Sequence, residues 1–191
     1  MEDIRVVKKE IRTAMKARLA TVSLDETLRA SNSVLAQLES FEQWKRAETV
    51  LAFLSMKDEL DTIPILKAVL EQGKILAVPK VTGEDLVFYQ IQDLKKDVSP
   101  GAFGILEPVP GLNLVAGETL SEHHSLVLVP GLAFDNKKFR LGRGKGFYDR
   151  FLASAGDSLF KIGIGYSFQL VKKVPREPHD KALDLVITSL S

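Results

Sequence analysis

The sequence has no cysteine, and only three histidines and one tryptophan occur among its 191 residues. The lack of cysteine excludes disulfide bonds, thiolate metal sites and a cysteine nucleophile. No apolar run approaches the roughly 18 residues that a membrane-spanning helix needs. The net charge is only +1, so the chain lacks the charge bias of a general nucleic-acid or membrane-surface binder. We therefore expect no nucleic-acid partner and no membrane partner.

The start of the chain lacks the pattern of a secretory signal, because Met1-Glu-Asp-Ile-Arg5 is charged. We therefore expect a cytoplasmic protein. A content of 45% hydrophobic and 27% charged residues is that of an ordinary globular protein. A chain of this length can bury one sizeable core, so we expect a single domain over residues 1–191. The sequence does not fix the oligomeric state, although we favour a monomer.

Hydrophobic spacing predicts helices and strands that alternate along the chain. Ile4, Val7, Ile11 and Met15 recur at helical spacing and predict a helix over residues 3–19. A capping box at residues 23–26 predicts a second helix that ends at about residue 39. Strands are predicted over residues 49–53, 74–78, 86–91, 125–129, 161–165 and 185–188, helices over residues 62–73 and 147–155, and a surface loop over residues 99–117.

The order of these elements predicts an α/β fold with a mainly parallel central sheet flanked by helices. Residues 49–78 form a strand-helix-strand unit, which implies a parallel pair with a right-handed crossover. In such sheets, ligands bind beyond the carboxyl ends of the strands. Glu59 follows the strand 49–53, and a glycine-rich loop follows the strand 125–129. Asp184 fits this rule less well, because it precedes the last strand.

The glycine-rich loop carries an unusual concentration of positive charge. Residues 137–150 hold six bases against one acid, Asp149, in a chain that is otherwise slightly acidic. Gly142, Gly144 and Gly146 allow the backbone to approach a bulky anion and to adopt positive φ. A predicted strand precedes the loop and a predicted helix follows it, so backbone N–H groups and the helix dipole meet at one point. This pattern indicates a phosphate site, although it matches no P-loop.

Two segments here resemble the signature of the 5-formyltetrahydrofolate cyclo-ligase family, also called methenyltetrahydrofolate synthetases. They are Pro130-Gly-Leu-Ala-Phe-Asp135 and Arg140-Leu-Gly-Arg-Gly-Lys-Gly-Phe-Tyr-Asp-Arg150. The likeness extends through residues 8–12, 53–59, 103–108 and 179–188. Phe147 stands where the family usually has tyrosine, and Leu106 stands where proline is common.

The resemblance implies an enzyme that converts 5-formyltetrahydrofolate to 5,10-methenyltetrahydrofolate with ATP and Mg²⁺. Phosphorylation of the formyl oxygen would create a leaving group, and N10 of the folate would attack the formyl carbon. Loss of phosphate would then give the methenyl product, with ADP released. No side chain has to act as a covalent nucleophile, so catalysis would rest on positioning and charge neutralisation.

The resemblance also implies a role for each site residue. Lys145 and Arg143 would be the catalytic cations, and Asp149 and Asp184 would hold Mg²⁺. The predicted ATP contacts are Lys8, Lys9, Arg12, Arg140, Leu141, Gly142, Arg143, Gly144, Lys145, Gly146, Phe147 and Tyr148. The predicted folate contacts are Leu54, Met56, Glu59, Arg143, Gly144, Lys145, Gly146 and Phe147.

The residue patterns alone leave simpler interpretations open. Lys8, Arg12 and Lys16 could form a solvated basic helix face. Asp149 could pair with Arg150 or Arg143, and Glu59 could be a helix-entry carboxylate near Thr62. His179 is expected to be structural or to lie at the rim of the site, and His123-His124 reads as a solvated turn.

Two rival functions also remain open. The same α/β layout (NagB/RpiA/CoA-transferase-like) occurs in sugar-phosphate isomerases and CoA transferases, which could bind a phosphate without ATP. A non-catalytic folate- or nucleotide-binding regulator is the second rival. Binding of MgATP and 5-formyltetrahydrofolate, together with an assay for the methenyl product, would separate the three.

Overall fold

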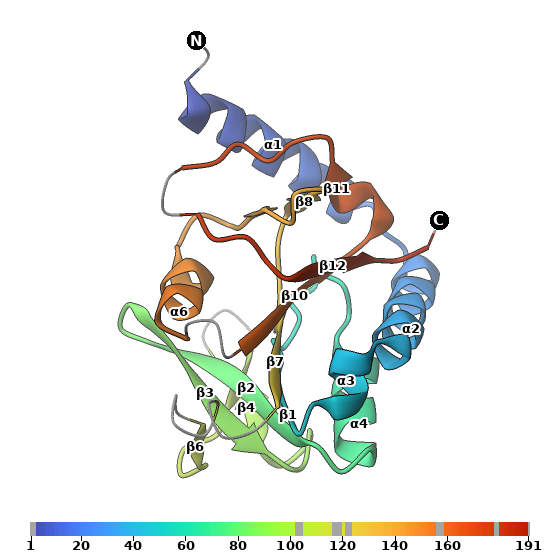
Figure 1. Cartoon of the computed structure of the whole chain (residues 1–191), viewed down its shortest axis with the longest axis vertical. Coiled ribbons are helices and arrows are strands. Elements are labelled where there is room, and N and C mark those ends of the chain that lie inside the picture. The colour runs from blue at the N-terminus through green and yellow to red at the C-terminus, as the bar shows by residue number, and fades with distance from the viewer. Residues whose placement is uncertain are drawn as a thin grey trace.

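A seven-stranded sheet forms the centre of the computed structural model, which describes residues 3–101, 105–115, 120, 124–155, 159–177 and 180–190. The strands are easily followed in Figure 1. In spatial order they are β12 (Leu185–Thr188), β10 (Leu159–Gly165), β7 (Ser125–Val129), β1 (Thr49–Leu51), β2 (Ile75–Thr82), β3 (Asp85–Ile91) and β6 (Leu114–Val115).

The first five of these strands run parallel, and β3 and β6 are antiparallel to their neighbours. The predicted α/β fold with a mainly parallel sheet is therefore confirmed. The strand-helix-strand unit is also present, because α4 (Ile63–Glu71) connects the parallel pair β1 and β2. α6 (Phe147–Ala155) comes after β7 and before β10 in the sequence, and these two strands are parallel neighbours in the sheet.

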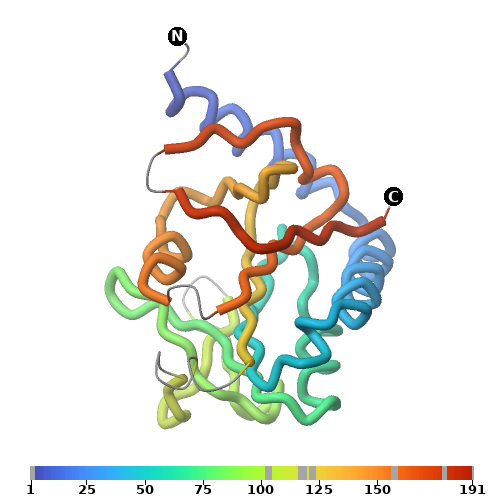
Figure 2. The backbone as a smooth tube through the Cα atoms, viewed as in Figure 1, coloured from blue at the N-terminus to red at the C-terminus, as the bar shows by residue number. Residues whose placement is uncertain are grey.

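Helices cover both faces of the sheet. α2 (Leu24–Ser40), α3 (Glu42–Arg46) and α4 lie on one side, and α6 lies on the other (Figure 1). α1 (Ile4–Leu19) lies across the top of the view, beside a small sheet of β11 (Leu170–Val171), β8 (Ala133–Asp135) and β9 (Arg140–Leu141). Figure 2 shows this N-terminal segment running alongside the red segment that precedes β12.

Several predicted boundaries differ from the observed ones. β1 ends at Leu51, although the N–H of Ala52 still donates to the carbonyl of Ala77 at 2.9 Å. β2 and β10 are longer than predicted. The predicted surface loop over residues 99–117 is wrong in part, because it includes most of β4 (Val98–Pro100), all of β5 (Leu106–Pro108) and β6. The strands β8, β9, β11 and a 3-10 turn at Ser167–Gln169 were not predicted.

The side chain of Phe134 explains three glycines near the sheet. Phe134 is fully buried. A Cβ atom on Gly131, Gly163 or Gly165 would lie 2.7, 2.6 or 3.1 Å from atoms of its ring. Contacts this short cannot be relieved without moving a ring that is packed on all sides. The glycines of β10 therefore make room for the phenylalanine of β8.

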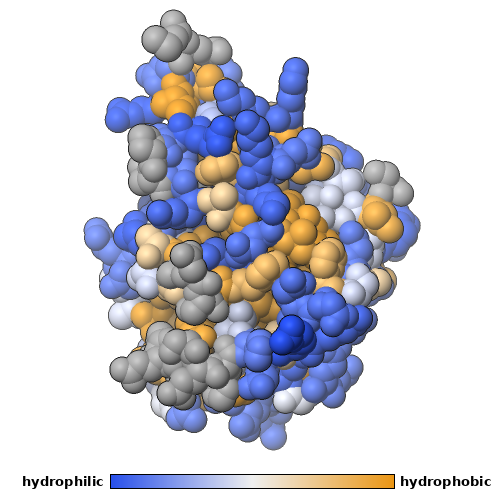
Figure 3. All heavy atoms as spheres, in the orientation of Figure 1, coloured by the Kyte–Doolittle hydropathy of each residue, from blue (hydrophilic) through white to orange (hydrophobic). Residues whose placement is uncertain are grey.

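The described helices include no candidate for a membrane-spanning segment. None of them is long and apolar enough to cross a membrane. Figure 3 shows apolar side chains gathered near the centre of the face that carries β10 and β12, with hydrophilic side chains above and below.

Candidate active site

The segment after β7 folds into a hairpin and then into the predicted phosphate loop. Asp135 organises the hairpin turn, because its Oδ1 accepts hydrogen bonds from the N–H groups of Lys137 (2.9 Å) and Phe139 (3.1 Å). Its Oδ2 accepts from the N–H of Val174 at 3.0 Å. The aspartate of the first motif is therefore a buried structural residue, and it positions β9 directly before the glycine-rich loop.

The phosphate loop, which we define as residues 142–146, adopts the backbone that its glycines were expected to allow. Gly144 and Gly146 have φ values of +102° and +72°. Side chains of other residues disfavour this region, so both positions call for glycine. The loop leads directly into α6, whose first residue is Phe147.

Arg140 and Asp149 form a close ion pair across the loop. Nη2 of Arg140 donates to Oδ1 of Asp149 at 2.6 Å, and the arginine side chain is only 4% exposed. Burial lowers the pKa of Arg140, and the negative charge of Asp149 partly offsets that effect. The sequence left open an ion pair between Asp149 and Arg150 or Arg143. The observed partner is Arg140 instead.

Arg143 connects the loop to the segment that follows β1. Its Nη1 and Nη2 atoms donate to the two carboxylate oxygens of Asp58 at 3.0 and 2.8 Å. Its Nε atom donates to Oε1 of Glu59 at 3.2 Å. Burial acts to lower the pKa of Arg143, but the bonds to Asp58 and the charge of Glu59 outweigh it and the pKa is raised. The two predicted sites therefore share a direct contact.

Glu59 is mostly buried beside the loop. Its carboxylate is 13% exposed and also accepts a hydrogen bond from the N–H of Met56 at 3.0 Å. Burial raises the pKa of Glu59, although the Met56 N–H and Arg143 oppose the shift. Glu59 is not the helix-entry carboxylate of α4. That role belongs to Asp61, which accepts from the N–H of Ile63 at 3.0 Å.

Two buried polar atoms near the loop have no hydrogen-bond partner among the described residues. They are the hydroxyl of Tyr148 and Nε of Arg140. The Arg140 guanidinium lies 5.8 Å from the centre of the Tyr148 ring. Burial raises the pKa of Tyr148 and the charge of Glu59 adds to the shift, so the hydroxyl stays protonated. Buried polar groups normally find partners, so unpaired donors at this position indicate a place for a polar ligand.

Lys145 differs from the two arginines of the loop. Its residue is exposed, and within the described ranges its ammonium makes no hydrogen bond or ion pair. Its carbonyl oxygen accepts from Nη1 of Arg150 at 3.2 Å, which anchors the backbone beside it. Lys145 is therefore a free cation on a held backbone.

α1 contacts the site through two of its basic residues. Nε of Arg12 donates to the carbonyl of Gly142 at 3.0 Å. Nζ of Lys8 pairs with Glu177 at 2.8 Å and with Asp180 at 3.2 Å, and the Lys8 side chain is 10% exposed. The interpretation of this stripe as a solvated face is wrong for Lys8 and Arg12, whereas Lys9 and Lys16 are exposed.

The two predicted metal ligands have different surroundings. Asp149 is partly exposed and keeps its Oδ2 atom for another partner, since Arg140 binds Oδ1. Asp184 lies at the start of β12, where its Oδ2 atom accepts from the N–H of Lys161 at 2.8 Å and lies 3.9 Å from Nζ of Lys161. No group of three or more metal-binding side chains occurs in the described ranges. One or two carboxylates still fit Mg²⁺ when a nucleotide supplies phosphate oxygens.

The remaining predicted contacts differ in burial. Leu141 and Leu54 are buried, whereas Met56 and Phe147 are partly exposed. The guanidinium of Arg150 lies 5.3 Å from the centre of the Phe147 ring. His179 and His123 lie outside the described residues, as do Phe103 and Gly104 of the segment 103–108. Asp58, which binds Arg143, was not among the predicted site residues, and its place beside Glu59 was the only signal for it in the sequence.

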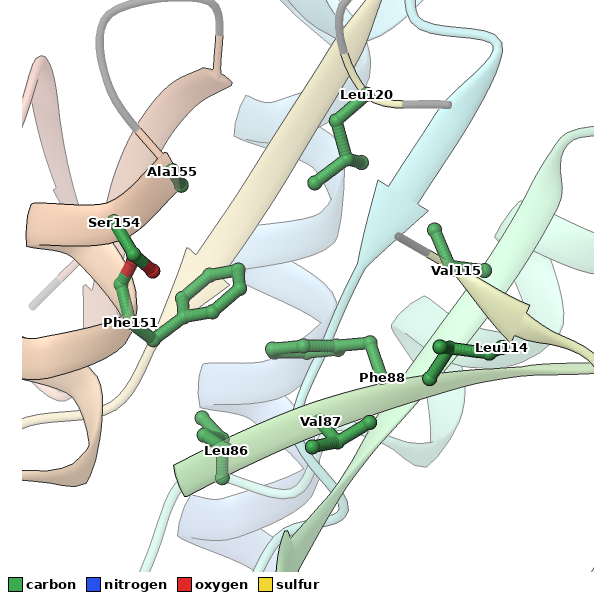
Figure 4. Close-up of a pocket in the computed structure, with 9 residues that line it drawn as sticks. All are labelled: Leu86, Val87, Phe88, Leu114, Val115, Leu120, Phe151, Ser154 and Ala155. Carbon is green, nitrogen blue, oxygen red and sulfur yellow. The ribbon is translucent and has the colours of Figure 1, made fainter. Parts of the chain in front are cut away.

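A cavity of about 210 Å³ lies elsewhere, between β3, β6 and α6 (Figure 4). Phe88 and Phe151 lie in contact in its lining, with ring centres 4.7 Å apart. Its lining is apolar except for Ser154, whose hydroxyl donates to the carbonyl of Phe151 at 2.8 Å. Without a charged lining residue this cavity cannot hold a phosphate, so it is not the predicted site.

Comparisons with known proteins agree with the geometry. Residues 4–189 match a family model described as the 5-formyltetrahydrofolate cyclo-ligase family. The 5-formyltetrahydrofolate cyclo-ligase of Mus musculus is 30% identical over 199 residues, covering 96% of this chain and 94% of the mouse protein. The NMR structure of Aquifex aeolicus 5,10-methenyltetrahydrofolate synthetase has a TM-score of 0.81 and 34% identity, covering 94% of this chain and 88% of that chain. A 5,10-methenyltetrahydrofolate synthetase from Mycoplasma pneumoniae, 23% identical over 95% of this chain and 98% of its own, shares the fold with a TM-score of 0.74.

Proposed function

Since this chain belongs to the 5-formyltetrahydrofolate cyclo-ligase family, we propose that the loop at residues 142–146 and the segment 54–59 form one active site for folate and ATP. The chain is an enzyme that converts 5-formyltetrahydrofolate to 5,10-methenyltetrahydrofolate, and the family uses ATP as a co-substrate. Membership of this family rules out the two rival functions, a sugar-phosphate isomerase or CoA transferase and a non-catalytic regulator. We assign the reaction to residues 1–191 acting as one domain.

The observation that carries the proposed site is the contact between Arg143 and Glu59. Nε of Arg143 lies 3.2 Å from Oε1 of Glu59. A residue of the phosphate loop therefore contacts the residue that we propose binds folate. Transfer of a phosphoryl group from ATP to the formyl oxygen requires both substrates to meet within bonding distance. A loop that binds phosphate and contacts the folate segment supplies that arrangement.

The contacts of each basic residue in and near the loop indicate its proposed role. Lys145, whose ammonium has no partner among the described residues and whose carbonyl is held by Arg150, would follow the oxygens of the transferring phosphoryl group. Charge develops on those oxygens during transfer, so a fixed cation stabilises the transition state. Arg143 would hold the folate segment against the loop and contribute positive charge. Lys8, Lys9 and Arg12 would contribute to nucleotide binding from α1, with Arg12 held against the loop at Gly142.

Folate binding would use the buried polar groups beneath the loop. Glu59 would accept hydrogen bonds from N–H groups of the pterin, since its carboxylate is held by the Met56 N–H and Arg143. Leu54, Met56 and Phe147 would contribute the apolar surroundings. The protonated hydroxyl of Tyr148 would donate to a ligand oxygen and so satisfy a buried atom that otherwise has no partner in the described chain.

Magnesium would enter with the nucleotide. The Oδ2 atom of Asp149 and the carboxylate of Asp184 are the side-chain groups that would hold it. When bound, Mg²⁺ would neutralise phosphate charge and orient the phosphate oxygens. The protein groups that fix Asp149 are Arg140 and the first turn of α6.

A spectrophotometric assay for 5,10-methenyltetrahydrofolate tests the proposal. The purified protein should form the product only when 5-formyltetrahydrofolate, ATP and a divalent cation are all present. Equal turnover in excess EDTA would refute the requirement for the metal. Absence of turnover under every nucleotide and metal condition, by protein shown to be folded, would refute the assignment of the activity.

A cytoplasmic location and a monomeric state are further parts of the proposal. The folate and nucleotide contacts assigned above lie within one chain, which supports the monomeric state. Cell fractionation and analytical ultracentrifugation of the purified chain would test the two statements.

A further inference from the structure

Asp58 accepts most of the hydrogen bonds that the side chain of Arg143 donates. Both carboxylate oxygens of Asp58 accept from the guanidinium, and its carbonyl oxygen accepts a weaker bond from Nη2 at 3.4 Å. An arginine has five N–H donors in a fixed plane. With the bond from Nε to Glu59, four of the five donors of Arg143 are engaged by two consecutive residues.

This geometry is more specific than that of an ordinary surface ion pair. Single pairs on a protein surface contribute little, because two long side chains must be ordered in water. Here the pair is bidentate, and the side chains of Arg143 and Asp58 are only 29% and 37% exposed. Two parallel charge-assisted bonds fix the plane of the guanidinium as well as its distance. The orientation of that plane aims Nε at the carboxylate of Glu59.

Arg143 stands between two segments that are far apart in the sequence. It belongs to the phosphate loop, whereas Asp58 and Glu59 follow β1, with 85 and 84 positions between them and Arg143. A nucleotide that orders the loop would thereby order Arg143, and Arg143 would hold Glu59 ready for the folate. A folate that orders Glu59 would act on the loop through the same contacts.

We propose that Asp58 is a positioning residue that couples folate binding to nucleotide binding through its bidentate contact with Arg143. The inference rests on the proposed function of the two segments and deepens it. Because the contact ties the two segments together, a ligand that restrains one of them would also restrain the other, and the second ligand would bind more tightly without new contacts of its own. Such coupling is reciprocal, because each ligand must change the affinity of the other by the same factor.

Calorimetric titration of the full-length protein measures this coupling. The dissociation constant of 5-formyltetrahydrofolate is determined without nucleotide and again with saturating MgADP, which cannot phosphorylate the folate. In the wild type we expect MgADP to tighten folate binding by about fivefold or more, the lower end of common couplings. In Asp58→Asn, which keeps the shape but loses the charge, the factor should fall to about twofold or less.

Asp61→Asn is the matched control. Asp61 lies on the same segment and is also an aspartate, but its carboxylate contacts Ile63 and Ser55 and not the loop. Its substitution should leave the coupling factor at the wild-type value. Asp58→Glu retains the charge on a longer stem and should recover more coupling than Asp58→Asn.

The outcomes separate this inference from the proposed function. Absence of folate binding by the folded wild type would refute the proposed site itself. If the wild type binds folate with no change on addition of MgADP, the coupling does not exist. A full coupling factor in Asp58→Asn, or equal losses in Asp58→Asn and Asp58→Glu, would show that the charge of Asp58 does not carry it. A double-mutant cycle with Arg143→Lys should show that Asp58→Asn adds no further loss when the planar fork is absent.

Discussion

Replacement of Lys145 by methionine tests the chemistry of the phosphate loop most directly. Methionine keeps an unbranched stem of similar length and removes the ammonium. Lys145 is exposed, and its ammonium has no partner among the residues that the structure describes. The substitution therefore leaves no buried group unpaired, and the free energy of unfolding should change by no more than about 0.5 kcal/mol.

The effect on catalysis should be much larger than the effect on stability. Loss of one preorganised contact to developing oxyanion charge costs about 2.7–4 kcal/mol, or roughly 10²- to 10³-fold in kcat. Lys145 lies between Gly144 and Gly146, and the bond from Arg150 to its carbonyl holds the backbone, so a phosphate bound at the loop would have the ammonium within reach. We therefore expect kcat to fall by at least about 10²-fold.

The assay is methenyltetrahydrofolate formation at saturating MgATP and at several folate concentrations. Lys172→Met is a suitable control, because Lys172 is an exposed lysine on the segment after β11 and outside the loop. If Lys145→Met keeps the wild-type kcat and only raises the KM for ATP, Lys145 contributes equally to ground state and transition state. The catalytic cation would then have to be Arg143 or Arg140.

Four further predictions concern Glu59, Arg140 and Gly163. Glu59→Gln should weaken folate binding by about 1–3 kcal/mol with little change in ATP affinity, and a calorimetric result of the opposite pattern would remove Glu59 from the folate pocket. Burial raises the pKa of Glu59 above its ordinary value of 4.5, so the stability of the wild type relative to Glu59→Gln should fall as the pH rises through that higher pKa. Urea unfolding of both proteins across this pH range measures the difference, and the absence of a trend would refute the shift. Arg140→Met removes a buried cation and leaves Asp149, which is 37% exposed and can be solvated, so the unfolding free energy in urea titration should fall by about 1–3 kcal/mol. A change near zero would contradict a stabilising role for this pair. Gly163→Ala should cost about 1–3 kcal/mol, because the new methyl group would meet the Phe134 ring, and an unchanged melting temperature would contradict that packing argument.

The regular elements could be predicted because their signals are local. The strand 125–129 and the helix 147–155 were predicted with the observed bounds, since an uninterrupted apolar run and an apolar helical face define them. The small sheet of β8, β9 and β11 escaped prediction. Its strands contain two or three residues each, too few to display a period, and they are held by the contacts of Asp135 with distant N–H groups.

In the candidate site, the types of the functional residues could be predicted from the sequence, whereas their partners could not. The glycine pattern correctly indicated positive φ at Gly144 and Gly146. The partners of the charged residues could not be predicted, because the ion pair of Asp149 with Arg140 and the fork of Arg143 with Asp58 depend on the folded arrangement. Lys8 illustrates the limit, since its helical spacing matches that of a solvated stripe but Glu177 and Asp180 bury it.

The ion pair between Lys8 and Glu177 spans 169 positions of the chain. Together with the bond from Arg12 to Gly142, it joins the first helix to the phosphate loop and to the segment before the last strand. On the ribosome, synthesis of the loop alone would therefore not complete these contacts, because Glu177 and Asp180 emerge after it. A nascent chain would acquire this full set of contacts around the first helix only after Asp180 has left the exit tunnel.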